Sequence, residues 1–242
     1  MARASKAKGV KPSSQLVQIQ RPQGDGKLVH TVDAAFAAVA RKSGDWLVCR
    51  PGCTQCCHGP FPISQLDVAR LRHGLEQLAQ SDPRKASAIR ARARRSAARL
   101  AADFPGDVST GVLSEDEEAI ERFEDFADHE PCPVLSVDGA GRCELYAARP
   151  MTCRVFGPPI RSEGPTIRSE GPPVHAVHMS SEHHDDALAL GHCELCYHGA
   201  TPEEIAACEL DPHTDELEEK LNRDAEKRSG TRGRTIIAFA LR

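Results

Sequence analysis

Ten cysteines, gathered into three groups, constrain what this chain of 242 residues can fold into more than any other feature. The first group is Cys49, Cys53, Cys56 and Cys57, the second is Cys132, Cys143 and Cys153, and the third is Cys193, Cys196 and Cys208. The basic stretch Met1–Lys27 lacks the apolar segment of a secretory signal, so we expect a cytoplasmic protein. Closely spaced thiols in a reducing compartment are more often metal ligands or redox centres than disulfides. The pattern therefore predicts a metal-binding protein.

The bulk composition limits the core and the classes of partner. Aromatic residues make up only 4% of the chain, so we expect a modest core rich in Leu, Ala and Val. Bound metal would add to its stability, because metal-binding free energy becomes folding free energy. The net charge of -4 gives no reason to expect a nucleic-acid partner. The longest apolar run, Ile236–Leu241, is far shorter than the roughly 20 residues of a bilayer span, so we expect no membrane partner.

The spacing of the cysteines indicates which metals they suit. Steps of two or three residues let consecutive sulfurs reach one metal through a tight turn. Cys49-x3-Cys53-x2-Cys56 and Cys193-x2-Cys196 have such steps. All-thiolate sets favour zinc or an iron–sulfur cluster over magnesium or calcium. Of these two cofactors, the spacing favours the iron–sulfur cluster.

The number of cysteines predicts two centres, or one centre with a redox pair. Cys208 lies in a predicted helix and is interpreted as a small buried residue, which leaves nine cysteines, and eight complete two four-thiolate sites. Neighbouring side chains on extended backbone point apart. We therefore expect Cys56 to share a metal with Cys53, and Cys57 to face a second centre or the core. The candidate metal ligands are Cys49, Cys53, Cys56, Cys57, Cys132, Cys143, Cys153, Cys193 and Cys196.

No cysteine group alone supplies both centres, so we expect the groups to converge in space. The sulfurs of five cysteines should lie within roughly 4–8 Å of one another, a scale set by metal–sulfur bonds of about 2.3 Å; these are Cys49, Cys53, Cys132, Cys143 and Cys153. The weaker candidate ligands are His58, His192 and His198. Arg149 and Arg154 flank Cys153, and they either stabilise a thiolate or cap a turn and pair with an acid.

Apolar periodicity and capping residues predict a mostly helical chain. Helices are expected over 31–43, 65–79, 83–103 and 114–129, from 202 onward, and over 211–227. Residues 83–103 are rich in arginine and 114–129 in Asp and Glu. We expect these two helices to form an antiparallel hairpin with opposite charges facing. In the alternative, the arginines form an open patch for RNA or phosphate. Residues 234–241 are equally compatible with a strand and a helix.

The expected organisation has three parts. Residues 1–28 form a disordered tail, 29–210 a single cysteine-cluster domain, and 211–242 a C-terminal helix and tail. Within the domain lie the charged helical hairpin over 80–130 and an insertion over 160–192. The insertion contains a tandem repeat, Ile160–Pro165 and Ile167–Pro172, and several histidines. It is interpreted as a polar loop, or else as a weak metal-binding segment. The fold class expected is mainly α and irregular, with a cysteine-rich metal-centred core and long loops.

Several short motifs together resemble a known family. They are Cys49, Gly52-Cys53 and Cys56-Cys57, then Pro131-Cys132-Pro133-x-Leu135, Cys143-x-Leu145-Tyr146 and Arg149-Pro150-x-x-Cys153-Arg154-x-Phe156, and finally Cys193 and Cys196. Over about residues 45–200 the chain is similar to the YkgJ cysteine-cluster family, whose domain is described as zinc- or iron-chelating and which is related to flagellin lysine N-methylase. The resemblance implies metal ligands at Cys49, Cys53, Cys56, Cys57, Cys132, Cys143, Cys153 and Cys193 or Cys196.

Three functions are compatible with the sequence. The preferred one is a metal-binding protein that chelates iron, as an iron–sulfur cluster, or zinc, with an oxidoreductase or electron-transfer role. The second is a cluster-dependent protein-modification enzyme like the lysine N-methylase. The third is a structural zinc protein whose charged helices bind a macromolecular partner. An enzyme needs an open metal position, whereas a structural site is closed by protein ligands. The expected partners are therefore a metal ion and, through the charged helices, a protein.

Overall fold

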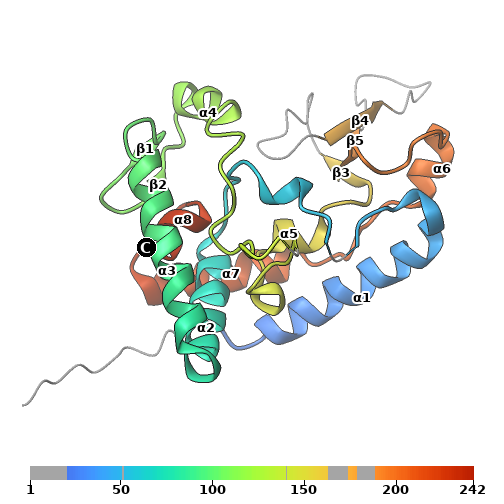
Figure 1. The fold of residues 1–242 in the computed structure, drawn as a ribbon. Helices are drawn as coiled ribbons and strands as arrows, with labels where there is room; N and C mark the ends of the chain where they lie inside the picture. The colour runs from blue at the N-terminus through green and yellow to red at the C-terminus, as the bar shows by residue number, and fades with distance from the viewer. Residues whose placement is uncertain (1–20, 51, 140, 163–173, 179–188) are drawn as a thin grey trace, which may run out of the picture.

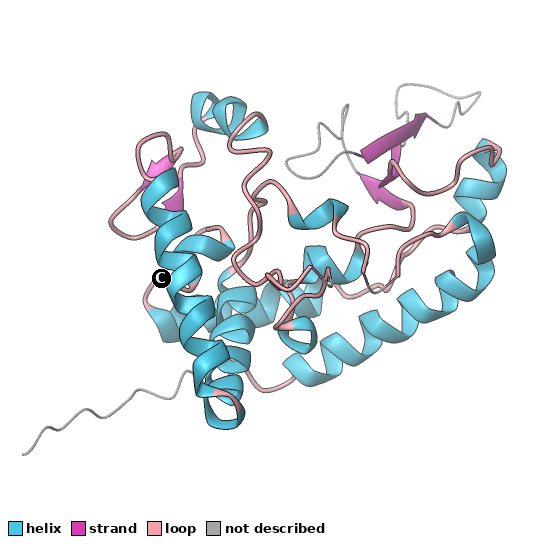
Figure 2. Cartoon of the chain, viewed as in Figure 1, coloured by secondary structure: helices cyan, strands magenta, loops and turns pink. Residues whose placement is uncertain are grey.

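Helices dominate the architecture, and the strands are few and short (Figure 2). The computed structural model describes residues 21–242 except 51, 140, 163–173 and 179–188. The helices are α1 Asp25–Ser43, α2 Gln65–Ser81, α3 Pro83–Leu100, α4 Glu117–Glu124, α5 Met151–Val155, α6 Pro202–Ala207, α7 Asp215–Ser229 and α8 Ile237–Ala240. The strands are β1 Gly106–Asp107, β2 Val112–Leu113, β3 Ile160–Ser162, β4 Val174–His178 and β5 Ala189–Cys193. The mainly α fold class is confirmed. None of the helices in this described part is long and apolar enough to cross a membrane.

A hairpin of α2 and α3 forms one side of the molecule (Figure 1). Ser64 begins α2 with a capping box, in which its hydroxyl accepts from the Asp67 backbone N–H and the Asp67 carboxylate accepts from the Ser64 backbone N–H. Asp82 separates the two helices and caps α3, which has Pro83 as its first residue. The buried faces of both helices contribute to one apolar cluster, which includes Leu71, Leu75, Ile89 and Ala93.

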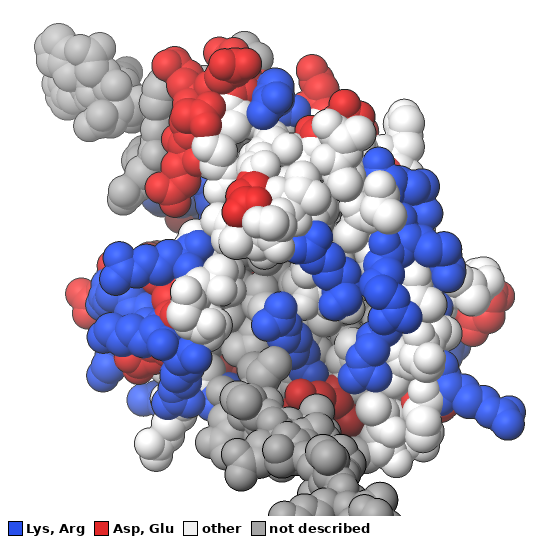
Figure 3. All heavy atoms as spheres, turned by 90° about the vertical axis from the view of Figure 1, so that its left-hand side faces the viewer, with Lys and Arg blue, Asp and Glu red and all other residues white. Residues whose placement is uncertain are grey.

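The arginine-rich helix α3 pairs with other helices than the acidic one that was predicted. The arginine-rich helix α3 packs against α2 and α8, and the acidic helix α4 is a short element that starts only after Asp116 caps it. The prediction that a helix over 114–129 faces α3 in an antiparallel hairpin was therefore wrong. The reason is that α2 and α8 cover the apolar face of α3. The short helix α4 contributes only Phe123 to the aromatic cluster at the C-terminal end of α3. Figure 3 shows acidic side chains at the top of this face, where α4 lies, and basic ones below.

The C-terminal segment, which the sequence left undecided, is a buried helical turn. Ile63 and Thr235 exchange both backbone hydrogen bonds, at 2.7 and 3.0 Å, and so fix the entry to α8. Ile237 then joins the apolar cluster of α2 and α3, while Phe239 stacks on Phe104 with ring centroids 4.2 Å apart. The last residues of the chain therefore connect the two clusters that α3 contacts.

Helix α1 leads from the N-terminal side of the described chain to the first cysteine group. It begins at Asp25, earlier than the predicted Thr31, because Leu28 and Val32 are completely buried against Leu66 of α2 and Leu221 of α7. Gly44, with a φ of +53°, ends the helix, and Cys49 follows shortly afterwards. The tertiary contacts of α1 therefore determine where the first cysteine group starts.

Strands β3, β4 and β5 form a sheet in the segment that was predicted to be a polar loop. Strand β5 lies between β3 and β4 and is antiparallel to both, with Ile160 opposite Gly191 and Val174 opposite Cys193. The loop interpretation is wrong for these strands, because residues with β propensity pair across the segment. Most of the tandem repeat and the stretch His183–Asp186 lie outside the described residues. The sheet matters for the candidate site because β5 ends at Cys193 and so fixes the position of this residue.

Candidate metal centre

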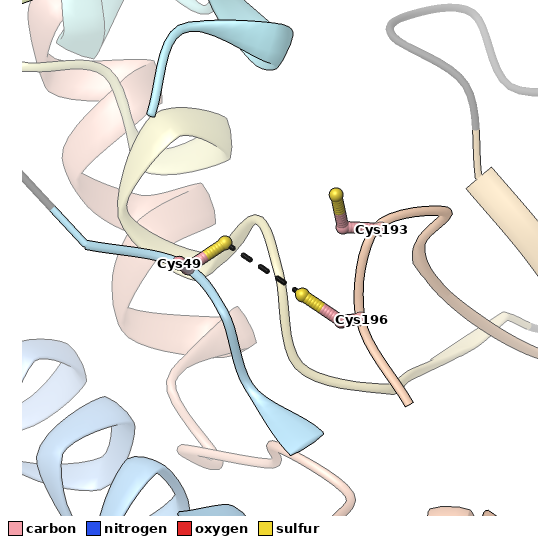
Figure 4. Close-up of side chains that lie close together, drawn as sticks. All are labelled: Cys49, Cys193 and Cys196. Carbon is pink, nitrogen blue, oxygen red and sulfur yellow. Dashed lines mark hydrogen bonds between the residues drawn. The ribbon is translucent and has the colours of Figure 1, made fainter. Parts of the chain in front are cut away.

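Three cysteines from two distant parts of the chain meet at one point. The sulfurs of Cys49, Cys193 and Cys196 all lie within 4.8 Å of one another. The Sγ atoms of Cys49 and Cys196 are 3.9 Å apart (Figure 4). Cys193 and Cys196 are almost completely buried, and Cys49 is half-buried. We call this set the Cys49 centre.

Backbone hydrogen bonds hold the third cysteine group against the segment that carries Cys49. The Cys193 N–H donates to the Gly157 carbonyl at 3.2 Å, and the Cys196 N–H donates to the Cys193 carbonyl at 2.9 Å. The Tyr197 N–H donates to the Trp46 carbonyl at 2.8 Å, three residues before Cys49. Apolar side chains, among them Trp46 and Phe156, surround the three sulfurs. The tight turn after β5 and the hydrogen bond between Tyr197 and Trp46 together fix the positions of the thiols.

Gly157 makes room for the Cys49 sulfur. Its φ is +127°, which L side chains rarely adopt, and an added Cβ would lie 2.7 Å from Cys49 Sγ. Its carbonyl is the acceptor for Cys193. The same glycine therefore contacts both sides of the Cys49 centre.

The thiols of the Cys49 centre differ in pKa. Hydrogen bonds with Cys193 and Cys196, together with burial, raise the pKa of Cys49, while hydrogen bonds from Cys193 and Cys49 lower the pKa of Cys196 to about 3. A thiolate at Cys196 is thus stabilised by two neutral thiols. A metal cation bound there would take the place of their protons, since thiolates are the form that binds metal.

A second set of cysteines lies close by. Cys132, Cys143 and Cys153 pack against the apolar cluster of α2 and α3, and each interacts electrostatically with Cys56. Burial raises the pKa of all three thiols, that of Cys132 to about 12. We call Cys56, Cys132, Cys143 and Cys153 the Cys56 centre. Among the described residues, its sulfurs are not drawn together within 4.8 Å as those of the Cys49 centre are.

Pairing between loops brings the Cys56 centre together. The Cys132 N–H donates to the Cys57 carbonyl at 2.8 Å, and Leu135 pairs with Cys143 in an isolated bridge. Gly141, with a φ of +59°, packs so closely on the Cys53 loop that an added Cβ would be 2.7 Å from the Gly52 carbonyl oxygen. The first and second cysteine groups are therefore joined through backbone contacts.

Cys56 and Cys57 are arranged differently from the prediction. They lie on a 3-10 turn, Gln55–Cys57, and not on extended backbone. The turn brings their thiols together, and the hydrogen bond with Cys57 is the main reason that the pKa of Cys56 is raised. The premise of extended backbone is therefore wrong for this pair, and the assignment of Cys57 to a second centre or the core stays a prediction. The charge of Cys193, a residue of the Cys49 centre, also contributes to raising the pKa of Cys56.

The cysteine groups converge, but with different partners from those expected. Cys49 joins the third group and not the second, because β5 carries Cys193 to it. Cys53 lies on the same loop, where its N–H donates to the Arg50 carbonyl at 3.0 Å. Cys208 is buried in the apolar cluster around the Cys49 centre but is not one of its three sulfurs. Among the described residues, Cys53 belongs to no set of three sulfurs within 4.8 Å of one another.

Acidic residues that sequence reasoning did not identify position the Cys153 helix. Asp33 of α1 accepts from Arg154 Nη1 at 2.9 Å with both carboxylate oxygens. Asp67 of α2 accepts from the Met151 N–H at 2.9 Å, at the start of α5. Both arginines therefore pair with Asp33, since Arg149 Nη2 also lies 3.4 Å from its Oδ1. Arg149 donates to the Tyr146 carbonyl as well, and its charge lowers the pKa of Cys143 against the larger effect of burial. A search for acids spaced along the apolar faces of α1 and α2 could have found these partners.

The histidine candidates lie outside the cysteine sets. His58 is exposed, and its Nδ1 lies 3.1 Å from the Thr54 carbonyl oxygen. His192 is buried with Nδ1 3.0 Å from the Cys193 carbonyl oxygen, and His198 is exposed. In the described chain neither His58, His192 nor His198 joins the Cys49 centre. Both centres are thus built from thiols.

Comparison with known proteins agrees with this geometry. Residues 48–164 match the family model CxxCxxCC, described as "Putative zinc- or iron-chelating domain". The match includes the first and second cysteine groups and ends before the third. No curated protein and no solved structure matched the chain. The resemblance recognised from the sequence motifs is confirmed.

Proposed function

We propose that the protein binds metal ions through cysteine thiolates at two neighbouring centres, because residues 48–164 match the model of the CxxCxxCC family, described as a zinc- or iron-chelating domain. The Cys49 centre uses Cys49, Cys193 and Cys196. The observation that carries the proposal is the gathering of these three sulfurs within 4.8 Å although they lie far apart in the sequence. Crowded thiols repel one another once ionised, and a cation offsets this repulsion.

The sulfur spacing favours a single ion at the Cys49 centre. Four thiolates arranged tetrahedrally at about 2.3 Å from one zinc ion have sulfurs about 3.8 Å apart. The separation of 3.9 Å between Cys49 and Cys196 agrees with this value. A [4Fe–4S] cluster holds its four thiolates farther apart, because each is bound to a different iron. The distance therefore supports a single ion over such a cluster, and zinc is the ion that we propose.

The two centres use eight of the ten cysteines. The Cys56 centre supplies four thiols, and the Cys49 centre supplies three. Cys53 and Cys57, which are on the same loop as Cys49, are the two candidates for its fourth ligand. One cysteine of this pair is then spare, and Cys208 is a buried apolar residue. This agrees with the arithmetic of two four-thiolate sites.

Burial supports a structural role over an enzymatic one. Cys193 and Cys196 are buried among apolar side chains, as expected for a site closed by protein ligands. A catalytic site keeps one metal position open to substrate. A cytoplasmic location is part of the proposal, because closely spaced thiols that serve as metal ligands are typical of a reducing compartment. The protein is thus proposed as a zinc-chelating protein whose metals tie its loops together.

Metal analysis of anaerobically purified protein tests this function. We expect a colourless protein with two zinc ions per chain. Cys49→Ser should lose one equivalent of zinc, and Cys153→Ser should lose the other. Cys208→Ser, a buried cysteine outside both centres, is the matched control and should keep both.

Three outcomes contradict the proposal. Visible absorption with stoichiometric iron and sulfide would replace zinc by an iron–sulfur cluster and restore the electron-transfer role. Loss of both metals in each single variant would show one centre instead of two. Loss of metal in Cys208→Ser, with none lost in Cys49→Ser, would remove the ligand assignment as a whole.

A further inference from the structure

A groove separates α3 from the loop that carries Cys132. It has a volume of about 240 Å³. Its lining residues from α3 follow helical spacing and so share one face, and they are Arg92, Arg95, Ser96 and Arg99. The other side is a loop that contributes mostly apolar residues, which are Pro131, Cys132, Pro133, Leu135, Ser136 and Val137. We call this feature the arginine groove.

The arginines of the groove are not neutralised completely by their neighbours. Arg92 donates Nε to the Pro133 carbonyl at 2.9 Å and pairs with Glu144, and Arg99 pairs with Glu130 at 2.5 Å. Arg95 is exposed, and no ion pair joins it to any described residue. A guanidinium carries five N–H donors, so Arg92 and Arg99 also keep donors unused by these carboxylates. Three positive charges therefore face two negative ones.

A buried hydroxyl in the same groove has unused hydrogen-bonding capacity. Ser96 is only 2% exposed, and within the described chain its Oγ has no hydrogen-bond partner. Leaving a buried polar group unpaired destabilises the folded state, so such groups in native proteins call for an explanation. Ser96 lies one helical position from Arg95 and in line with Arg92 and Arg99. A ligand that accepts hydrogen bonds would satisfy both the hydroxyl and the guanidinium groups.

We propose that the arginine groove binds a small oxyanion, a phosphate or carboxylate group, through Arg95, Ser96 and the free donors of Arg92 and Arg99. Arginine is suited to such groups because its planar donors match their oxygens. The groove lining contains no aromatic side chain on which a nucleic-acid base could stack. Its apolar wall, where Val137 is 79% exposed, would cover the organic part of a carboxylate ligand. The ligand would also lie against Cys132, at the edge of the Cys56 centre.

Calorimetric titration of the metal-loaded, full-length protein at constant ionic strength tests the proposal. Inorganic phosphate is one probe and malonate is the other, so that the two sources of oxyanion are distinguished. We expect saturable binding of at least one probe. Arg95→Gln should weaken it about tenfold, the loss of one charge-assisted hydrogen bond, and Ser96→Ala should weaken it less. Arg94→Gln is the matched control, because Arg94 is an exposed arginine of the same helix outside the groove.

The metal content of every variant is measured alongside, so that a folding defect is recognised. Absence of saturable binding to both probes in the metal-loaded protein would overturn the proposal. Equal weakening by Arg94→Gln and Arg95→Gln would also overturn it, because the charge of the whole helix would then be responsible. Tight, steeply salt-dependent binding of single-stranded RNA with the same equal weakening would assign the helix to nucleic acid instead.

Discussion

At the scale of single residues, glycines and not only cysteines determine the geometry of the candidate centres. Gly157 and Gly141 both adopt positive φ, and both approach a neighbouring segment more closely than a Cβ would permit. Gly157 touches the Cys49 sulfur, and Gly141 touches the backbone of the Cys53 loop. The cysteines supply the chemistry, whereas these glycines allow the loops to approach.

Gly157→Ala should therefore empty the Cys49 centre selectively. The added methyl group would lie 2.7 Å from Cys49 Sγ, so either the sulfur or the backbone that holds Cys193 must shift. We expect the variant to lose one equivalent of metal and to keep the other. Gly199→Ala is the control, since Gly199 also has positive φ, at +81°, but no atom lies within 4 Å of its added Cβ. Metal analysis of both purified variants makes the comparison, and equal metal content would count against the role of Gly157.

At the scale of secondary-structure elements, the sequence predicted what is local and missed what depends on partners. The capped helices α2, α3 and α6 are where their capping residues placed them, because a side-chain cap acts within a few residues. The helix that packs against α3 is determined by which apolar faces meet. The sequence analysis chose the acidic segment of α4 as that partner because its charge is opposite to that of α3, and charge did not decide the packing. Similarly, the sheet that carries Cys193 results from pairing between segments that the sequence separates by residues rich in Gly and Pro. The candidate ligands could be read from cysteine spacing, but not their division between two centres.

The packing of α7 against α2 creates a pH-dependent contact. Glu218 of α7 lies near Asp67 and Asp25, with Arg70 and Asp215 also close, and burial raises its pKa from 4.5 to about 7. Arg70 itself is completely buried and pairs with Asp25 at 2.6 Å and with Asp67. Between pH 4.5 and about 7, Glu218 holds a proton in the folded state that it has lost in the unfolded state. The stabilisation is full below pH 4.5 and disappears as the pH rises through about 7.

Glu218→Gln should accordingly remove part of this pH dependence. At pH 8 we expect the variant to be more stable than the natural sequence by about 1–2 kcal/mol, a value reduced from that of the whole pKa change because Glu218 is partly exposed. At pH 4.5 the two proteins should be nearly equal. Urea unfolding at both pH values measures the difference, and Glu216→Gln, a change to an exposed carboxylate on the same helix, is the control. A constant difference at both pH values would exclude the titration of Glu218 as its cause.

At the scale of the whole molecule, the cysteines lie where separate segments of the chain meet. The Cys49 centre joins the end of α1 to β5, and the Cys56 centre joins three loops to the α2–α3 hairpin. The aromatic cluster around Phe104, Phe123 and Phe239 contains no cysteine. The molecule therefore consists of a part whose packing depends on thiols and a part that packs on its own.

Removal of metal should loosen these two parts to different extents. Because metal-binding free energy is folding free energy, the protein stripped by a chelator under reducing conditions should have a lower melting temperature. Hydrogen exchange should speed up in residues 47–57, 131–153 and 189–197, where backbone bonds connect the cysteine loops. Amides at the C-terminal end of α3 and around Phe123 of α4 should stay protected, since the described residues of their apolar cluster include no thiol. Mass spectrometry of peptides with and without zinc compares these segments, and re-addition of zinc is the control for reversibility. Equal exchange in every peptide of the two forms would mean that the cysteine loops hold together without metal, and the structural role proposed for the centres would fail.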